Sequence, residues 1–401
     1  MIFGVISIWL LYLLAKELFS EKIALIVSAL MSVSPVMVFY SQEARAYSLF
    51  VMLTILSFYF FIKYIDGKNN KNLFAYGFFS LLLIYTHLFS FLVLFVQNAY
   101  ILYRYKFQFK QLLYWFITQI SLVLLFVPWI SNLSRQVNNT LYTMWIRNPD
   151  LINIFYTYHD FFGNAFNLII FILILAALIK FKKFKASEKN QFVFLACWII
   201  LPFIAVLFYS LLVTSVYHTR YLLFTVPGVL ILFSVVIDKI AERKIYIKYF
   251  LIGIIIISSL ISVAYHVKRI DKDDWRAVNS FIKKNVNEDE IVFISPFYHQ
   301  DPFTYYYDPE CFKEKFIPSC NYKKNMILSM DWMADCCSDK TLLTAPSGRN
   351  ELGYYLDQNI WLISVRPELY DVNNSLFSYF NHRKIITLTK EFGEIKIYKF
   401  E

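Results

Sequence analysis

The chain has 401 residues, of which 58% are hydrophobic, and carries a formal net charge of +10 with a mean hydropathy of +0.49. This apolar fraction exceeds that of an ordinary soluble domain, and apolar runs near the length of a bilayer span, almost free of charged residues, exclude a soluble fold. The basic residues stand mostly between these runs, so they indicate membrane orientation rather than a nucleic-acid partner.

Ten apolar segments predict ten membrane-spanning helices. In chain order they lie near Met1–Leu14, Ile23–Tyr40, Tyr47–Ile65, Leu73–Tyr85, Leu88–Tyr103, Leu112–Ile130, Ala165–Phe181, Phe192–Thr214, Tyr221–Ile237 and Tyr246–Tyr265. We therefore expect an α-helical polytopic membrane domain over residues 1–266.

The charges between the spans predict which side each connection faces. One alternate set holds seventeen basic residues, namely Lys16, Lys22, Lys63, Lys68, Lys71, Arg104, Lys106, Lys110, Lys180, Lys182, Lys183, Lys185, Lys189, Lys239, Arg243, Lys244 and Lys248. The other set holds only Arg45, Arg135, Arg147 and Arg220. By the positive-inside rule the first set is cytoplasmic, which places the protein in the plasma (inner) membrane with the segment after the last span outside.

The outward set contains arginine but no lysine. A guanidinium can hold a phosphate with two parallel hydrogen bonds, so these arginines are candidate phosphate ligands. Interfacial snorkelling is the competing interpretation, and it explains at least Arg135 and Arg147.

From Val267 the composition becomes mixed and charged, which predicts a small α/β extracytoplasmic domain over residues 267–401. Asp274–Asn285 has helical spacing, Ile291–Ser295 and Trp361–Val365 resemble strands, and a helix is expected near Leu369–Phe380. Two further strands, Lys384–Thr389 and Glu394–Phe400, flank a turn at Gly393.

Four cysteines lie in this C-terminal part, on the oxidising side of the membrane: Cys311, Cys320, Cys336 and Cys337. One disulfide is expected there, with Cys311 and Cys320 the favoured pair. The sequence contains no CxxC repeat or paired histidine spacing, so we expect no metal site.

Ionisable and phenolic side chains gather in three short outward connections. Glu43 and Arg45 lie in the first, Tyr85 and His87 in the second, and His218, Arg220 and Tyr221 in the third. Ionisable groups at the membrane surface are candidate functional groups. Two structural interpretations compete with this one: an ion pair of Glu43 with Arg45 that caps two helices, and interfacial histidines without a chemical role.

Four segments carry a resemblance to a known family. The segment SPVMVFYSQEARAYSL, from Ser34 to Leu49, resembles the signature of bacterial family 39 type (GT-C, protein O-mannosyltransferase-like) membrane glycosyltransferases. YTHLFSFLVLFVQNAY, HTRYLLFTVPGVLIL and DDWRAV are similar to later segments of that group, in the same order along nearly the whole chain.

This resemblance implies transfer of a sugar from a polyprenyl-phosphate carrier to a lipid, glycan or protein acceptor at the outer face of the membrane, by inverting displacement. In the family an aspartate in the first large external loop is the main catalytic carboxylate, and Glu43 matches a second acidic position. No residue here matches the first position. Since Met1 also opens an apolar run outside the membrane, we expect that an upstream span and loop are missing and that activity of the chain as given is in doubt.

The resemblance and the outward connections together assign the candidate site. Glu43 is expected to be catalytic, and the expected substrate-binding residues are Gln42, Arg45, Tyr47, Tyr85, His87, His218, Arg220 and Tyr221. No cofactor, metal or nucleic acid is expected. Two alternatives remain open: a transporter or flippase of a lipid-linked sugar, and a non-catalytic membrane scaffold with an external binding domain.

Overall fold

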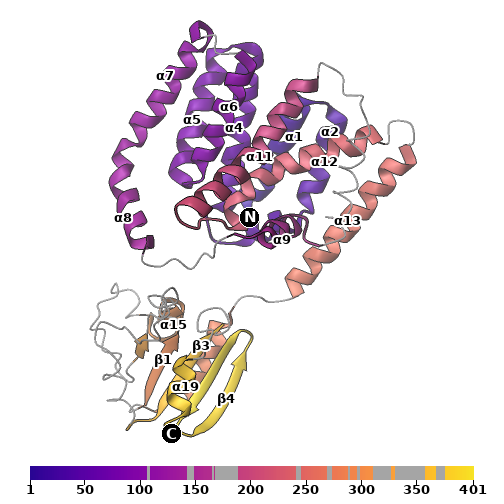
Figure 1. Ribbon diagram of the computed structural model, residues 1–401. Helices are drawn as coiled ribbons and strands as arrows, with labels where there is room; N and C mark the ends of the chain where they lie inside the picture. The colour runs from indigo at the N-terminus through magenta and orange to yellow at the C-terminus, as the bar shows by residue number, and fades with distance from the viewer. Residues whose placement is uncertain are drawn as a thin grey trace. The chain divides into compact units, whose positions relative to one another are not determined.

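The computed structural model of the protein describes residues 1–105, 109–141, 149–164, 167, 188–240, 245–268, 273–287, 290–295, 299–309, 327–329, 357–366 and 375–401. The chain forms two compact units, one of Met1–Asn138 with Ile146–Arg269 and one that contains Ile270–Glu401. The first is helical and the second is built around a sheet (Figure 1). Several predicted features lie outside the described residues, namely the span Ala165–Phe181, Arg147 and the cysteines Cys311, Cys320, Cys336 and Cys337.

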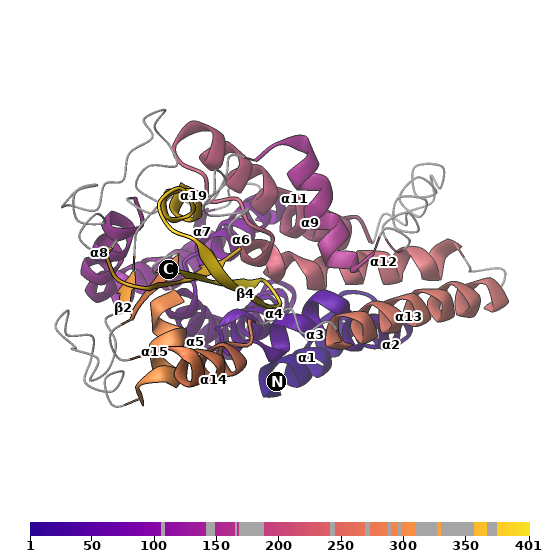
Figure 2. The same ribbon diagram turned by 90° about the horizontal axis from the view of Figure 1, so that it is seen from below.

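The first three helices are arranged around a break at Ser34. α1 (Ile2–Leu18) packs against α2 (Glu21–Ser32), and α3 (Pro35–Gln42) leaves α2 at an angle of 57°. Pro35 has no N–H and disfavours helical backbone at the residue before it, so the helix cannot continue through Ser34. The predicted span Ile23–Tyr40 is therefore not one straight helix but the bent pair α2 and α3, which together are long and apolar enough for one broken span. Figure 2 shows α2 and α3 beside α13 (Ile245–Lys268).

Buried polar side chains join the next four helices, which are α4 (Tyr47–Gly67), α5 (Asn70–Thr86), α6 (Ser90–Tyr105) and α7 (Phe109–Phe126). The fully buried Gln97 donates to Ser57 Oγ at 2.8 Å and accepts from the Tyr76 hydroxyl at 3.1 Å. Gln119 Nε2 donates to the same hydroxyl at 3.0 Å. Because a polar group in an apolar interior needs a partner, these bonds fix the order and rotation of the helices.

The other helices that the structure describes in this unit are η1 (Val127–Trp129), α8 (Ile130–Leu141), α9 (Leu151–Phe162), α11 (Lys189–Leu212), η3 (Thr219–Thr225) and α12 (Val226–Ile240). The Asp150 carboxylate caps α9 by accepting from Asn153 N at 2.7 Å. α9 ends at Gly163, which has a φ of 73°. A Cβ at Gly163 would lie 2.4 Å from Pro35 Cγ, so only glycine allows the end of α9 to approach α3 so closely.

Five described helices are long and apolar enough to cross a membrane, namely Tyr47–Gly67, Leu112–Arg135, Lys189–Leu212, Thr219–Lys239 and Lys248–Val267. Each coincides with a predicted span. The predicted spans at Met1–Leu14, Leu73–Tyr85 and Leu88–Tyr103 lie on α1, α5 and α6, which have 17, 17 and 16 residues. At 1.5 Å per residue these helices are about 25 Å long, somewhat less than a bilayer core. The chain is a helical polytopic membrane protein.

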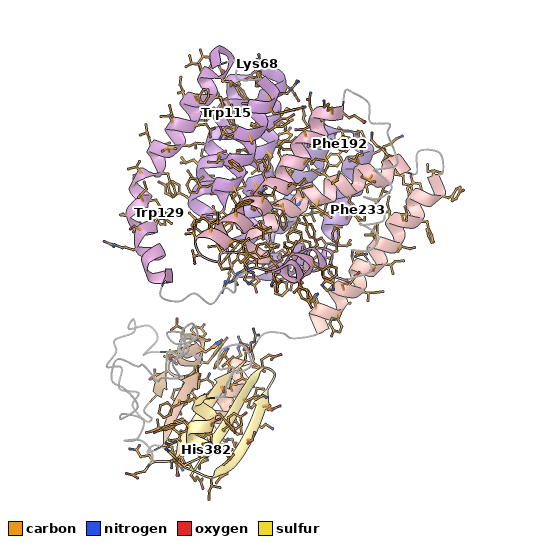
Figure 3. The ribbon with its side chains drawn as sticks, viewed as in Figure 1. Lys68, Trp115, Trp129, Phe192, Phe233 and His382 are labelled. Atoms are coloured by element: carbon orange, nitrogen blue, oxygen red, sulfur yellow. The ribbon has the colours of Figure 1, made fainter. Side chains whose placement is uncertain are left out.

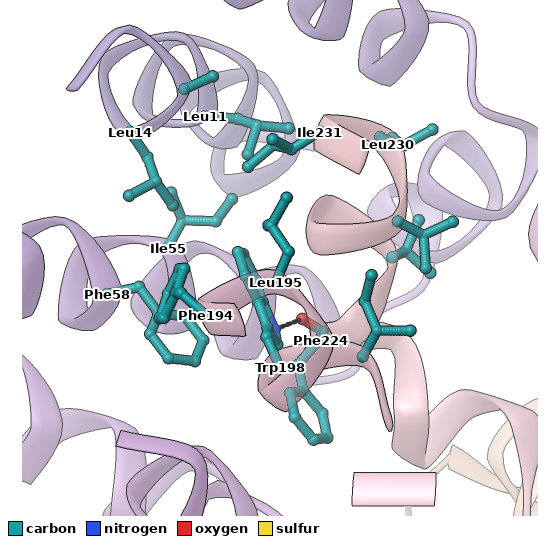
Figure 4. Close-up of a cluster of buried hydrophobic side chains, with 14 of the residues drawn as sticks. Leu11, Leu14, Ile55, Phe58, Phe194, Leu195, Trp198, Phe224, Leu230 and Ile231 are labelled. Atoms are coloured by element: carbon teal, nitrogen blue, oxygen red, sulfur yellow. Dashed lines mark hydrogen bonds between the residues drawn. The ribbon is translucent and has the colours of Figure 1, made fainter. Parts of the chain in front are cut away.

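Aromatic packing fills the centre of the helical unit. Trp198 of α11 is fully buried and contacts Phe58 of α4 at a ring-centroid distance of 4.4 Å. Its Nε1 donates to the carbonyl oxygen of Phe224 at 2.9 Å (Figure 4). A Cβ at Gly228 of α12 would lie 3.0 Å from the indole, so the absence of a side chain there lets α12 approach α11. Trp198 therefore connects α4, α11, η3 and α12.

The second unit contains a five-stranded sheet in the order β2-β1-β3-β5-β4. β1 (Ile291–Ser295) is parallel to β2 (Ile327–Ser329) and β3 (Ile360–Val365), whereas β5 (Ile395–Phe400) is antiparallel to β3 and to β4 (Ile386–Phe392). The helices among its described residues are α14 (Trp275–Asn285), α15 (Gln300–Tyr307) and α19 (Ser375–Asn381). β1 and β3 are buried along their whole length, as expected for strands with both faces covered. The predicted α/β fold of this part is confirmed.

A buried carboxylate anchors the central strands of this sheet. Glu290, just before β1, accepts from Trp361 Nε1 at 2.8 Å and pairs with Lys399 Nζ at 2.9 Å. It also accepts from Asn287 N and Asn359 Nδ2. Burial alone would raise the pKa of Glu290, but these hydrogen bonds together outweigh burial and lower it.

We expect Glu290→Gln to destabilise the second unit by about 2 to 4 kcal/mol at neutral pH, because Lys399 loses its buried partner. A lowered pKa gives stability that is complete above the ordinary glutamate pKa and is lost as the pH falls through the lowered value. Pulse proteolysis in urea on the full chain should therefore show a midpoint that falls with acidification in the wild type and changes less in the variant. A variant with the wild-type midpoint and pH dependence would contradict this role.

Candidate active site

Two short connections hold their histidines in the same way. His87 lies between α5 and α6, and its Nδ1 accepts from Phe89 N at 3.2 Å. His218 precedes η3, and its Nδ1 accepts from Arg220 N at 3.4 Å. An accepting Nδ1 requires the proton of the neutral ring on Nε2, so each imidazole presents an N–H donor on its far side.

The structure brings the three predicted connections together through a group of aromatic rings. His87 lies 5.8 Å from Tyr47, at the start of α4, and 5.7 Å from Tyr221 of η3, measured between ring centroids. His218 lies 5.6 Å from Tyr221, and Tyr40 of α3 lies 5.2 Å from Tyr47. Residues separated by more than 150 positions in the sequence thus surround one location.

Arg220 supplies the positive charge at this location. Its guanidinium carbon lies 5.3 Å from the centroid of the Tyr221 ring, and its charge acts on the hydroxyls of Tyr40 and Tyr47. Burial, together with the Arg220 charge, lowers the pKa of both His87 and His218 to about 4. Both imidazoles are therefore neutral at physiological pH, and Arg220 carries the cationic charge among these three side chains.

Glu43 and Arg45 lie in the connection from α3 to α4, as predicted, but they do not pair with each other. Within the part of the chain that the structure describes, Glu43 has no ion pair or hydrogen bond, and its charge acts on the Tyr40 hydroxyl. Arg45 is exposed and hydrogen-bonds to the Tyr47 hydroxyl. An ion pair that caps two helices therefore does not explain these residues.

Asp160, near the end of α9, is a member of this group that sequence reasoning missed. Its Oδ2 accepts from Thr219 Oγ1 at 3.3 Å, next to Arg220, and its charge acts on the Tyr40 hydroxyl. The only available sequence signal was an acidic residue beside a histidine in an outward connection, and Asp150 in the same connection serves as a helix cap.

Two of the predicted substrate-binding residues, Tyr85 and Gln42, are not among the ring contacts described above. Tyr85 points towards α7, where its hydroxyl donates to the Leu125 carbonyl at 2.7 Å and its ring lies 5.8 Å from Trp129. Gln42 is exposed at the end of α3. Figure 3 shows Trp129 and Lys68 towards opposite ends of this part of the helical unit. Tyr85 lies beside Trp129, whereas Lys68, a predicted cytoplasmic lysine, follows the end of α4. The Tyr85 end of α5 therefore lies away from Lys68.

A cavity of about 140 Å³ adjoins the tyrosines. Tyr40 and Tyr47 form one part of its lining, and Ile8, Met37 and Val51 from α1, α3 and α4 form another. The break at Ser34 turns α3 away from the direction of α2 and so leaves this space between the helices. Its mostly apolar lining suits a hydrocarbon group rather than an ion.

No group of three His, Cys, Asp or Glu side chains among the described residues could hold a metal ion. The groups that do converge are a guanidinium, two neutral imidazoles, phenols and two carboxylates, beside an apolar cavity. Such a set can bind a phosphate, hydrogen-bond sugar hydroxyls and accept a proton.

Comparison with known proteins identifies the fold. Residues 1–131 match the model of the dolichyl-phosphate-mannose-protein mannosyltransferase family. The crystal structure of ArnT from Cupriavidus metallidurans in the apo state superposes with a TM-score of 0.57 at 10% identity, covering 99% of this chain and 82% of that one. The chain has a GT-C type glycosyltransferase fold. ArnT bound to undecaprenyl phosphate gives a TM-score of 0.55 with the same identity and coverage. A search of curated proteins by sequence finds no match.

The resemblance noted from the sequence is thus confirmed by the match over residues 1–131 and by the fold. The family match includes Glu43, Arg45, Tyr47, Tyr85 and His87. His218, Arg220 and Tyr221 lie beyond it, so their functional roles depend on the geometry described above.

Proposed function

We propose that this protein is a membrane glycosyltransferase that moves a sugar from a polyprenyl-phosphate carrier to an acceptor hydroxyl at the outer face of the membrane. The observation that carries this proposal is the position of Arg220 among Tyr40, Tyr47, His87 and Tyr221, with the charge of Glu43 acting on the same tyrosine hydroxyl. A cation beside a carboxylate suits displacement of a phosphate from an anomeric carbon.

Each group has a role in this proposal. Arg220, with Arg45 nearby, holds the carrier phosphate, and the neutral Nε2–H groups of His87 and His218 donate to sugar or phosphate oxygens. Glu43 binds the sugar or the acceptor. The related ArnT structure contains undecaprenyl phosphate, which supports a polyprenyl carrier here. The cavity beside Tyr40 and Tyr47 is large enough for a hydrocarbon group of about benzene size next to the phosphate.

Binding of the carrier tests this proposal directly. Labelled undecaprenyl phosphate should bind the protein in lipid nanodiscs, and Arg220→Ala should weaken binding about 10-fold to 100-fold because a charged hydrogen bond to phosphate is lost. Arg135→Ala is the matched control, since Arg135 is an exposed arginine of α8. Equal binding by the wild type and both variants, or none by the wild type, would refute the proposed carrier site.

We also infer that the second unit is extracytoplasmic, as the distribution of lysines predicts. In a background without the native cysteines, a membrane-impermeant maleimide should label Glu391→Cys in intact cells but Lys71→Cys only after lysis. Both side chains are exposed, so burial does not protect either one. Labelling of position 71 from outside would reverse the orientation.

A transporter of a lipid-linked sugar is the alternative with one structural feature in its favour, the bent pair α2–α3. Such proteins also place charges inside their spans. In the described spans the fully buried polar side chains are neutral, for example Ser57, Gln97 and Thr54. This difference favours the transferase.

A further inference from the structure

We propose that Asp160 is the general base of the transfer reaction and accepts the proton of the acceptor hydroxyl. This inference rests on the proposed glycosyltransferase function. It places a proton-accepting carboxylate on α9, a helix that the sequence motifs did not implicate.

The first argument is the place of α9 in the fold. α9 contacts both α3, which ends beside Glu43, and η3, which begins beside Arg220. The close approach of Gly163 to Pro35 fixes the end of α9 against the start of α3. A carboxylate one turn before Gly163 is therefore held at a constant position relative to the other site residues.

The second argument is how the carboxylate is held. Asp160 Oδ2 accepts from Thr219 Oγ1, and Thr219 Oγ1 lies 3.4 Å from Thr157 Oγ1. Thr157 in turn accepts from the Tyr217 hydroxyl at 2.9 Å. Thr157 Oγ1 itself donates to Asn153 O at 3.0 Å, so the Thr219 hydroxyl is the group that orients one carboxylate oxygen. Glu43, by contrast, has no hydrogen bond or ion pair in the described parts of the chain, so nothing there fixes its direction.

The third argument is accessibility. The side chain of Asp160 keeps 54% of its surface exposed, so an acceptor hydroxyl can reach it. Oδ1 lies 3.7 Å from His159 Nδ1, a contact that leaves room for a second hydrogen bond. Thr219 approaches the other oxygen, which leaves Oδ1 as the proton acceptor.

The fourth argument is electrostatic. His159 on α9, Thr219 on η3 and His266 on α13 act on Asp160, and the charges of Asp160, Glu43 and Arg220 all act on the Tyr40 hydroxyl of α3. Burial raises the pKa of Asp160, and the Thr219 hydrogen bond and the two histidines partly offset this effect. A carboxylate of raised basicity is a better base than an ordinary aspartate.

The reaction balances with these groups. A lone pair of the acceptor oxygen forms the bond to the anomeric carbon while the acceptor O–H proton passes to Asp160. The bond from the anomeric carbon to the carrier phosphate oxygen breaks, and its electron pair remains on the phosphate next to Arg220. Attack opposite the leaving phosphate inverts the anomeric configuration, and Asp160 later releases its proton to water.

Transfer kinetics in lipid nanodiscs test the inference. Asp160→Asn should lower kcat about 100-fold to 10,000-fold while carrier binding changes less than about twofold, because the amide cannot accept the proton. The acidic limb of the kcat/KM profile should disappear in this variant. Formate should restore part of the activity of Asp160→Ala, since a small carboxylate can replace the missing base.

Two further variants separate chemistry from folding. Thr219→Val removes the hydrogen bond that lowers the pKa of Asp160, so the acidic limb should move to higher pH. Asp150→Asn weakens the cap of the same helix and should leave the pH profile unchanged.

Full activity of Asp160→Asn, or an acidic limb that survives in it while the wild type transfers sugar, would overturn the role of Asp160 alone. Absence of any transfer by the wild type would instead overturn the proposed function and this inference with it.

Discussion

Replacing Arg220 with lysine is expected to lower kcat/KM for sugar transfer about 100-fold, although the charge is kept. Arg220 is partly buried, and its guanidinium carbon lies over the Tyr221 ring, 5.3 Å from the centroid. A lysine has a single strongly hydrated charge and loses the two parallel hydrogen bonds to a phosphate. Losing one such stabilising contact in a transition state costs about 2.7 to 4 kcal/mol.

Steady-state transfer from a polyprenyl-phosphate sugar measures this effect. Arg135→Lys is the matched control and should retain the wild-type rate, because Arg135 is an exposed arginine of α8. If Arg220→Lys also retains the wild-type rate, any cation suffices and the two-pronged contact with phosphate is wrong.

The largest effect on folding is expected for Trp198→Ala, which should destabilise the helical unit by about 3 to 5 kcal/mol. The substitution leaves a cavity between Phe58 and Phe194 and removes the donor to the Phe224 carbonyl. Gly228 faces the indole and has no side chain that could refill the space. The stability of Trp198→Phe should fall between that of the wild type and that of Trp198→Ala, since phenylalanine keeps most of the volume but loses the hydrogen bond.

Thermal unfolding in nanodiscs measures this prediction. Trp9→Ala serves as the matched control, because Trp9 is 62% exposed on α1 and leaves no internal cavity when truncated. A decrease in Tm that is as large for Trp9→Ala as for Trp198→Ala would show that internal packing does not dominate stability.

Local chemistry made much of the fold predictable. Asp274 begins α14 by accepting from Ala277 N at 3.0 Å, and Gly393, with a φ of 62°, makes the turn between β4 and β5. Such signals depend on a few adjacent residues, so one sequence reveals them. The long apolar helices were predictable because their hydropathy stays high over a continuous segment of the sequence.

The break at Ser34 was missed because hydropathy averages over a window. The average hydropathy of Ile23–Tyr40 is high, so the segment was predicted as one span. That average takes no account of the backbone restriction that Pro35 imposes on Ser34. The ends of α1 and α5 also differ from the predicted spans by a few residues, since apolar runs do not state where a helix ends.

The candidate site was only partly predictable. Membrane orientation alone indicated that Glu43, His87 and Arg220 share one face, because their connections alternate with lysine-rich ones. The contact of His87 with Tyr221 and the bond from Thr219 to Asp160 depend on tertiary packing of distant segments. No periodic pattern in the sequence encodes such contacts, which is why Asp160 was missed and the contact of Tyr85 with α7 was not predicted.

The central claim is that Arg220 and the surrounding side chains transfer a sugar from a polyprenyl-phosphate carrier. The most direct measurement is incubation of the purified protein in nanodiscs with an undecaprenyl-phosphate-linked sugar and a membrane extract as acceptor. The account predicts release of undecaprenyl phosphate together with a product of inverted anomeric configuration, both lost in Arg220→Ala. Release that continues at the wild-type rate in Arg220→Ala, or a product that retains the donor's configuration, would contradict it.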